Sequence, residues 1–402
     1  MRTLSLLALG SAAAALTAAP LLADGHGGSS GHMHHGDGHV PIYAEDLLGT
    51  YYDKLEARVD LPVAPANVSL APETVITRLA FGSCNHQLRP QGFWAEIAET
   101  NPDLFLFIGD NNYGDQGWDG DATLTTLREA YGVQAQTPEL AAFRANIPMM
   151  ITWDDHDYGF NDGGASFAFR GWAETIFETF WGSSDEVRAR PGVYEARMFG
   201  EEGRRTQVIM LDTRFFRSDL ATMEYTLDRR PLGPYAPSDD ATKTMLGDAQ
   251  WAWLEAELAK PADLRIIASS IQVLTDAHDY ESWEALPLER QKLYAMLAAR
   301  EDSGLVLLSG DRHAGGIYSD TPDAAGGEQL WELTSSSLNY SFSTTERNTA
   351  REPDDKRLTD FISEENFGLV DIDWSARTIT MTMRGAGGEF AGQDRVSRTV
   401  GW

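Results

Sequence analysis

The sequence predicts an α/β protein in which a largely parallel or mixed sheet is covered by helices. Short runs rich in β-branched residues or Leu alternate with stretches of helical spacing, which is the order expected of such a fold. Hydrophobic residues make up 42% of the 402 positions, enough for one large core or two modest ones. The predicted strands are Val75–Gly82, Leu104–Gly109, Met149–Thr152, Val208–Leu211, Arg265–Ala268 and Leu305–Leu308.

Residues 1–23 are predicted to form a cleaved signal peptide. Arg2 supplies the positive end, Leu4–Ala19 is an apolar run of small residues, and a plausible cleavage site lies between Ala23 and Asp24. An uncleaved anchor is the alternative, but Ser, Gly, Thr and Pro within the segment favour cleavage. We therefore expect an exported protein, periplasmic or secreted, that keeps no stable membrane anchor.

Residues 24–41 are predicted to be a flexible leader, because Gly, Ser and Asp dominate it and cannot bury a core. The leader is rich in histidine. It either collects zinc or copper or is a solvated tract with no fixed role, and the sequence favours neither. Residues 42–74 then combine apolar positions at helical spacing with a proline-punctuated linker. We expect the catalytic domain to span residues 75–402.

Two further helices and two hairpins are predicted within that domain. The helices are Phe93–Thr100 and Gln250–Lys260, and Asp248 could cap the second of them. The hairpins imply more sheet than a simple doubly wound fold has. Their strands are Val193–Phe199 with Arg205–Leu211, and Gly368–Trp374 with Arg377–Arg384.

The charge of the chain excludes some classes of partner. Lys plus Arg is 32 and Asp plus Glu is 61, which gives a net charge of −29. Such a field repels polyanions, so nucleic acid and anionic membrane are poor partners. The carboxylates would attract divalent cations, although a solvated acidic surface also accounts for most of them.

Each predicted strand is followed by residues that could hold a metal ion or a phosphate. Because open α/β sheets bind ligands outside the carboxyl ends of their strands, six such ends that meet would build one crowded, polar and anionic site. The clusters are Gly82-Ser83-Cys84-Asn85, Gly109-Asp110-Asn111-Asn112-Tyr113, Trp153-Asp154-Asp155-His156-Asp157, Leu211-Asp212-Thr213-Arg214, Ser269-Ser270-Ile271-Gln272 and Ser309-Gly310-Asp311-Arg312-His313.

Each cluster taken alone has a second interpretation. For Asp110 alone, the sequence supports a turn residue and a metal ligand equally. The run from Asp154 to Asp157 favours a metal, since carboxylates beside an imidazole suit a hard or borderline cation. Asp311 and His313 share one side of an extended segment and could both be ligands, or belong to a salt-bridged loop.

Two residues near these clusters stay open on sequence grounds. Cys84 is the single cysteine and cannot form an internal disulfide, so it is either a small buried hydrophobe or a thiolate ligand. Tyr113 is either packed in the core or a phenolate ligand to a ferric ion.

Four motifs in order resemble the PhoD-like (alkaline phosphatase D) family of the calcineurin-like metallophosphatase superfamily. The resemblance covers about Thr77 to about Gly388 and implies a four-layer α/β/β/α sandwich with a multinuclear metal centre. The motifs are Phe81-Gly82-Ser83-Cys84-Asn85, Gly109-Asp110-Asn111-Asn112-Tyr113, Trp153-Asp154-Asp155-His156-Asp157-Tyr158 and Ser309-Gly310-Asp311-Arg312-His313.

The same resemblance implies roles for individual residues. Asp110 matches the bridging carboxylate, and His156 matches the catalytic imidazole. The implied metal ligands are Cys84, Asp110, Tyr113, Asp155, Asp311 and His313. Gln272 stands where the superfamily usually has a further His, and His278 is six residues away, which favours an oxygen-rich second site. Iron and calcium are therefore the implied metals, in two or more sites, with zinc or manganese as alternatives.

These residues predict hydrolysis of a small phosphoester by a metal-bridging hydroxide. His156 would stabilise or protonate the leaving group, and the candidate substrate-binding residues are Asn85, Arg214, Arg312 and Gln272. Two alternatives remain. One is a phospholipase D-like phosphodiesterase that uses the same centre, and the other is a non-catalytic periplasmic metal-binding protein built on the leader and the acidic surface.

Overall fold

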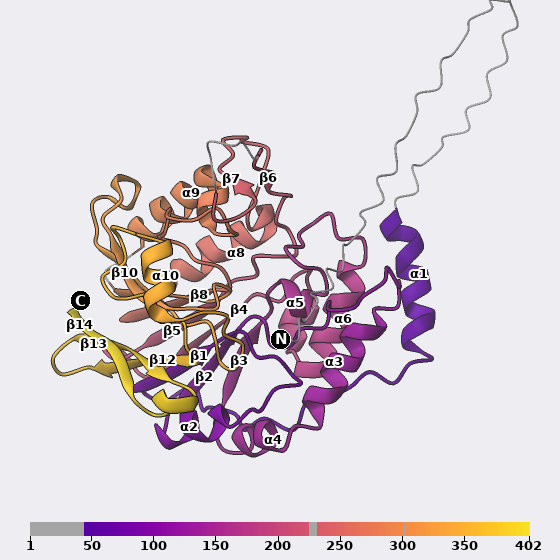
Figure 1. Cartoon of the computed structure of the whole chain (residues 1–402), viewed down its shortest axis with the longest axis horizontal. Coiled ribbons are helices and arrows are strands. Elements are labelled where there is room, and N and C mark those ends of the chain that lie inside the picture. The colour runs from indigo at the N-terminus through magenta and orange to yellow at the C-terminus, as the bar shows by residue number, and fades with distance from the viewer. Residues whose placement is uncertain (1–43, 225–230, 301–302) are drawn as a thin grey trace, which may run out of the picture. The chain divides into compact units, whose positions relative to one another are not determined.

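The computed structural model describes residues 44–224, 231–300 and 303–402, and two six-stranded sheets organise them (Figure 1). The predicted signal peptide and leader lie outside the described residues. The first sheet has the order β14-β13-β12-β1-β2-β3 and the second β10-β11-β9-β8-β5-β4. Their strands are β1 (Arg78–Gly82), β2 (Leu104–Ile108), β3 (Met149–Thr152), β4 (Glu195–Phe199), β5 (Thr206–Met210), β8 (Leu264–Ser269), β9 (Gly304–Ser309), β10 (Gly316–Asp320), β11 (Leu330–Thr334), β12 (Asn366–Asp373), β13 (Thr378–Gly385) and β14 (Asp394–Gly401).

Each sheet has a parallel centre and antiparallel additions. Strands β1, β2 and β3 are parallel, as are β5, β8, β9 and β11. The two predicted hairpins are present as β4–β5 and β12–β13, with Asp373 opposite Thr378 at the second turn. A small two-stranded sheet joins β6 (Ala221–Thr222) to β7 (Tyr235–Ala236).

The helices cover the outer faces of the two sheets. The predicted helix before the domain is α1, and the structure also has several short helical turns. The α-helices are α1 (Ala44–Glu56), α2 (Phe93–Glu99), α3 (Thr125–Ala135), α4 (Pro138–Arg144), α5 (Asp155–Tyr158), α6 (Arg170–Trp181), α7 (Asp185–Arg188), α8 (Gly247–Leu258), α9 (Pro287–Ala298) and α10 (Thr345–Arg351), and the 3-10 turns are η1 (Trp283–Ala285), η2 (Asp323–Ala325) and η3 (Gly388–Phe390).

Alternation along the buried strands produces the layers. On β2, Phe105 and Phe107 belong to the core under the helices, whereas Leu106 belongs to the core between the sheets. On β8, Ile266 faces the other sheet and Ile267 packs toward α8 and α9. Strands covered on both faces are apolar throughout, which is why the sequence shows them as continuous runs. The predicted four-layer α/β/β/α sandwich is therefore what the structure shows.

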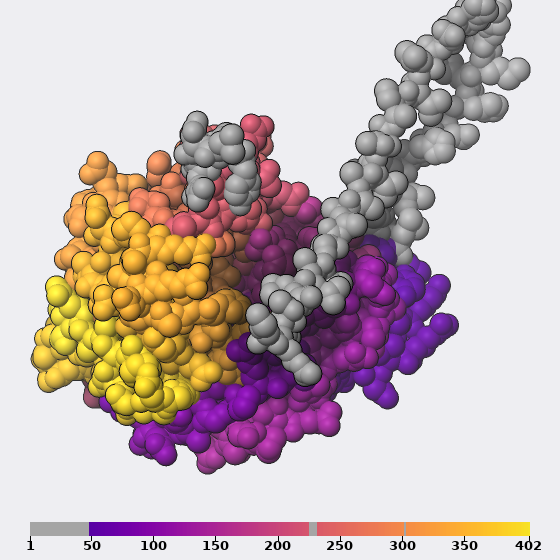
Figure 2. All heavy atoms as spheres, in the orientation of Figure 1, coloured from indigo at the N-terminus to yellow at the C-terminus, as the bar shows by residue number. Residues whose placement is uncertain are grey.

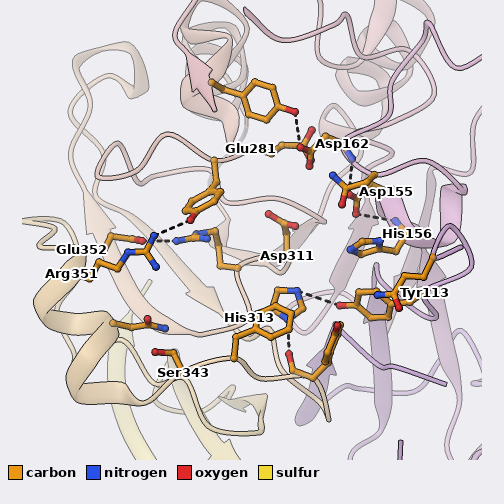
Figure 3. Close-up of a pocket in the computed structure, with 18 of the residues that line it drawn as sticks. Tyr113, Asp155, His156, Asp162, Glu281, Asp311, His313, Ser343, Arg351 and Glu352 are labelled. Carbon is orange, nitrogen blue, oxygen red and sulfur yellow. Dashed lines mark hydrogen bonds and ion pairs between the residues drawn. The ribbon is translucent and has the colours of Figure 1, made fainter. Parts of the chain in front are cut away.

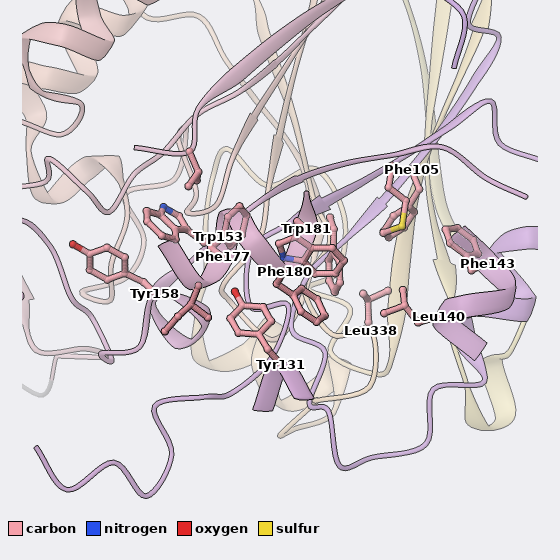
Figure 4. Packing of buried hydrophobic residues seen from close by; sticks show 14 of the residues in the cluster. Phe105, Tyr131, Leu140, Phe143, Trp153, Tyr158, Phe177, Phe180, Trp181 and Leu338 are labelled. Atoms are coloured by element: carbon pink, nitrogen blue, oxygen red, sulfur yellow. The ribbon is translucent and has the colours of Figure 1, made fainter. Parts of the chain in front are cut away.

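The helical layer on the first sheet is dominated by aromatic rings (Figure 4). Phe177 lies 5.2 Å from Trp153, and Phe180 lies 4.5 Å from Tyr131, between ring centroids. Aromatic pairs at these spacings contribute beyond their buried area. Because Trp153 directly precedes the acidic run after β3, this packing fixes the backbone from which that run departs.

The predicted cap of α8 is wrong. The helix begins at Gly247, one turn before the predicted start at Gln250, so Asp248 lies in its first turn. Gly247 has a φ of +67°, a conformation that glycine adopts readily, and the helix starts there with no side-chain cap. Within the described ranges, no helix is long and apolar enough to cross a membrane.

Candidate active site

The carboxyl ends of the central strands of both sheets meet at one place. The backbone N–H of Asn85, after β1, donates to the carbonyl of Asp110, after β2, at 2.9 Å. Across the sheets, the Thr152 hydroxyl donates to the Leu211 carbonyl at 3.0 Å. The structure thus brings the predicted clusters together, as the parallel order of the strands requires.

Four of the gathered residues have a left-handed backbone. Cys84, Asp110, Asp311 and His313 have φ of 58°, 48°, 69° and 49°, although none of them is glycine. Each such conformation costs about 1–3 kcal/mol and persists only where the surroundings enforce it. Gly109 allows the close approach that this needs, because a Cβ there would lie 2.6 Å from the Asp154 Cβ.

One group of candidate ligands combines a thiol, a phenol, a carboxyl and an imidazole. The Cys84 thiol and the Tyr113 hydroxyl both donate to Asp110 Oδ2, at 3.2 Å and 3.0 Å. Tyr113 Oη also lies 3.3 Å from His313 Nε2. Ligand atoms of Cys84, Asp110 and His313 fall within 4.8 Å of one another.

A second group is made of carboxylates and shares Asp110 with the first. Oxygen atoms of Asp110, Asp154, Asp155 and Asp311 lie within 4.8 Å of one another, and Asp110 and Asp155 form a further group with His156. Asp110 is common to all three groups. A carboxylate in that position can contact two neighbouring cations at once.

The electrostatics of these groups fit bound cations. Burial, with the nearby Cys84 thiol, raises the pKa of Asp110 well above its ordinary value, and burial with two neighbouring aspartates does the same for Asp311. Asp110 Oδ1 and Asp154 Oδ2 are buried with no hydrogen-bond partner in the described part of the chain. A buried carboxylate oxygen that lacks a donor is stabilised by a metal ion, so the residues present suit one.

The imidazoles of this region differ in charge. Burial lowers the pKa of His313 to about 3, so it is neutral and able to ligate. Burial also opposes the charge of His156, but Asp155 and Asp110 prevail and raise its pKa to about 11. His156 Nδ1 lies 2.8 Å from Asp115 Oδ1, and its ring packs 4.2 Å from that of Tyr113.

A cavity of about 530 Å³ opens beside these groups and is lined by residues from both halves of the chain (Figure 3). In the space-filling view, the indigo-to-magenta N-terminal segments and the orange-to-yellow C-terminal segments each cover a continuous part of the face (Figure 2). Asp155 and His156 come from the first half. Asp311, Arg312 and His313 come from the second.

Comparisons with known proteins agree with this geometry. The model of the PhoD-like phosphatase family matches residues 79–162 and 192–383. The chain belongs to the PhoD-like phosphatase family. The family predicted from the motifs is therefore confirmed. Alkaline phosphatase D of Bacillus subtilis (strain 168) is 24% identical over 316 residues, which cover 69% of this chain and 53% of the relative.

A solved structure of PhoD has the same fold as this PhoD-like chain. The TM-score is 0.60 at 20% sequence identity, and the match covers 85% of this chain and 70% of the other. The chain spans about half the length of the Bacillus subtilis relative.

Three predicted substrate-binding residues do not line the cavity of this PhoD-like protein. Arg214 is fully buried, and its Nε donates to Asp154 Oδ1 at 2.5 Å while its Nη1 pairs with Glu281 Oε2 at 2.6 Å. Asn85 donates to the Asn111 carbonyl at 3.0 Å. The side chain of Gln272 is hydrogen-bonded to Thr334 and lies 3.1 Å from His278 Nε2. All three stabilise the loops behind the site.

Arg312, the fourth candidate, lies on the cavity wall and already has partners. Its guanidinium pairs with Glu352 at 2.5 Å and lies 4.6 Å from the Tyr280 ring centroid. Asp162 and Glu281 also line the cavity and form an acidic group with Asp155. Neither residue was predicted as part of the site from the sequence, because neither follows a predicted strand.

Proposed function

We propose that the protein is a metal-dependent phosphoester hydrolase. The observation that supports this most is Asp110, which belongs to three candidate ligand groups beside a cavity large enough for a small organic phosphate. The membership of the chain in the PhoD-like phosphatase family supports the same activity.

The two ends of the site would hold different cations. Cys84, Tyr113 and His313, with Asp110, offer sulfur, phenolate and imidazole ligands, which suit an iron-like ion. Asp155 and Asp311, with Asp110, offer only oxygen, which suits calcium, with zinc or manganese as alternatives. When bound, such ions would polarise the phosphoryl oxygens and lower the pKa of a coordinated water toward neutrality.

His156 would act on the leaving group. Its Nδ1 lies 2.8 Å from Asp115 Oδ1, which would orient the ring and leave Nε2 as the proton donor toward the cavity. Donation of that proton to the departing alkoxide would complete ester cleavage. Asp115 would then be a positioning residue.

The domain organisation and location form part of the proposal. We infer a signal peptide over residues 1–23, a leader over 24–41, a helix and linker over 42–74 and the catalytic domain over 75–402. A signal peptide over residues 1–23 would direct export to the periplasm or the medium. A phospholipase D-like phosphodiesterase stays an alternative, because a cavity of about 530 Å³ is large enough for a phosphodiester.

Two measurements on the native protein test the proposal. Elemental analysis gives the number of bound metals, and turnover is measured on a phosphomonoester and a matched diester. Asp110→Asn should lose metal and turnover together, whereas Asp394→Asn, an exposed position with a 61% exposed side chain, should keep both. Turnover by Asp110→Asn near that of the wild type at saturating metal would refute the bridging role. If the full-length protein cleaves neither ester, and a variant without residues 25–40 loses most of the bound metal, the protein is a metal carrier without catalysis.

A further inference from the structure

The wall of the cavity opposite the acidic groups carries arginines. Arg347 and Arg351 lie on α10 and line the cavity, as does Arg312 from the loop after β9. Arg312 is paired with Glu352. Arg347 and Arg351 are exposed, and neither has a carboxylate within ion-pair distance in the described part of the chain. Figure 3 shows Arg351 on one side of Asp311 and the Asp155–His156 pair on the other.

Arg347 and Arg351 place positive charge on the cavity wall of a chain in which acidic residues outnumber basic ones by 61 to 32. Arg347 and Arg351 are also four residues apart on one helix, a spacing at which like charges lie on the same face and repel. An anion bound between the two guanidinium groups would remove that repulsion. The Glu364 carboxylate is not that anion, since it accepts a hydrogen bond from Thr345 and pairs with Arg395.

Aromatic residues orient this wall. The Tyr280 hydroxyl accepts a hydrogen bond from Arg351 Nη2 at 3.2 Å, and the Arg312 guanidinium lies over the Tyr280 ring. Phe342 is 62% exposed, and its ring lies 4.1 Å from that of His313. An exposed ring beside a candidate ligand can pack against the apolar part of a substrate. A guanidinium held by one hydrogen bond still has N–H groups free for an oxyanion.

We propose that the cavity takes phosphate esters that carry a second phosphate group, which Arg347 and Arg351 bind while the ester to be cleaved lies at the acidic side. The proposal rests on the proposed hydrolase function. Arginine forks match phosphate geometry, and a charge-assisted pair holds phosphate more strongly than neutral donors do. The wall would therefore determine substrate choice, with no part in bond cleavage.

The experiment compares two substrate series on the metal-loaded full chain. Alkanediol bisphosphates of increasing length carry the second phosphate, and ω-hydroxyalkyl monophosphates of the same lengths end in a hydroxyl. We expect the best bisphosphate to exceed its matched monophosphate at least ~tenfold in kcat/KM, and the ratio to shrink as salt is added. In Arg347→Gln/Arg351→Gln that ratio should fall at least ~tenfold.

The control is Arg58→Gln/Arg398→Gln, which removes the same charge at two exposed positions outside the cavity. Its ratio should match that of the wild type. An equal loss in the control would attribute the effect to total charge, and an unchanged ratio in Arg347→Gln/Arg351→Gln would exclude the arginine wall. Either result overturns the inference.

Binding separates this inference from the proposed hydrolysis. Non-hydrolysable alkane bisphosphonates and matched hydroxyalkyl phosphonates are titrated calorimetrically into the same proteins. If no ester is cleaved but the bisphosphonate still binds at least ~tenfold more tightly through the two arginines, the hydrolase proposal fails and the arginine site stands. If esters are cleaved but neither measurement distinguishes the two series, the hydrolase stands and the arginine site is refuted.

Discussion

Removal of the metals should destabilise the protein in a pH-dependent way. Burial raises the pKa values of Asp110, Asp154 and Asp311 because it disfavours their charged form, whereas at Asp155 the charges of His156 and Arg214 outweigh burial and lower the pKa. Burial raises the pKa of Asp154 to about 6, and that of Asp162 to about 7 with help from Glu281 and Asp155. In the unfolded chain both groups titrate near ~4.

The direction and size of the effect follow from these values. A carboxyl whose pKa is raised by folding favours the folded state below the unfolded pKa, and that contribution is lost as the pH rises through the folded pKa. A rise from 3.8 to about 6 at Asp154 corresponds to about 3 kcal/mol, and a rise to about 7 at Asp162 to about 4 kcal/mol. The metal-free protein should therefore lose several kcal/mol of unfolding free energy between about pH 4 and pH 7.

Bound cations should reverse this loss, because they stabilise the ionised carboxylates and bind only the folded chain. The assay is urea unfolding of the chelated and the metal-loaded protein at a series of pH values, followed by tryptophan fluorescence. The stability difference between the two forms should be small near ~pH 4 and grow to several kcal/mol near ~pH 8.

Glu174→Gln is the matched control. Burial raises the pKa of Glu174 to about 8, but this residue lies outside the cavity. The variant should change the pH dependence of both forms equally and leave the difference between them intact. A difference that stays constant from acid to alkaline pH would refute the reasoning, since it would mean that the buried carboxyls do not titrate against the metal.

Three further outcomes test single side chains. Cys84→Ser should lose about one equivalent of metal together with any visible thiolate band, while an unchanged spectrum would remove Cys84 from the ligands. Asp115→Asn should reduce kcat about 10- to 100-fold with the metal content unchanged, and a parallel loss of metal would contradict a positioning role. Arg214→Met leaves the buried Asp154 without an ion pair, while Glu281 keeps its pair with Arg217, and should cost about 3–5 kcal/mol in urea unfolding. Arg204→Met, whose ion pair with Glu201 is exposed at both ends, should cost no more than about 1 kcal/mol.

The strands and the residues that follow them could be predicted from the sequence because one physical rule covers both. A strand buried on two faces must be apolar throughout, and its end must be polar where it meets a ligand. Asp110, Asp155 and Asp311 are found in this way, each two or three residues after the end of such a run. The family resemblance then added roles that the pattern alone left open, notably those of Cys84 and Tyr113.

The rest of the cavity could not be predicted, since its residues sit on segments whose path depends on tertiary contacts. Glu281 and Asp162 lie on loops, and Arg351 lies on a seven-residue helix with no buried side chain. Arg214 is the converse case, a residue that the sequence placed in the site but whose side chain does not line the cavity. Its place after a strand suggests contact with substrate, but Asp154 and Glu281 enclose it, and the sequence does not show that they meet.

The hydrogen bonds at Asp110 also constrain which ion can bind beside it. Burial raises the pKa of the Cys84 thiol to about 11, and burial with the Asp110 charge raises that of Tyr113 further above its usual range. Both groups donate a hydrogen bond to Asp110, so each can ligate as an anion only if a bound ion displaces its proton. We infer that this end selects a strongly Lewis-acidic ion such as ferric iron. At the oxygen-only end, Asp155 accepts hydrogen bonds from backbone N–H groups and, among the described residues, none from a thiol or a phenol, so that end would suit a weaker Lewis acid such as calcium.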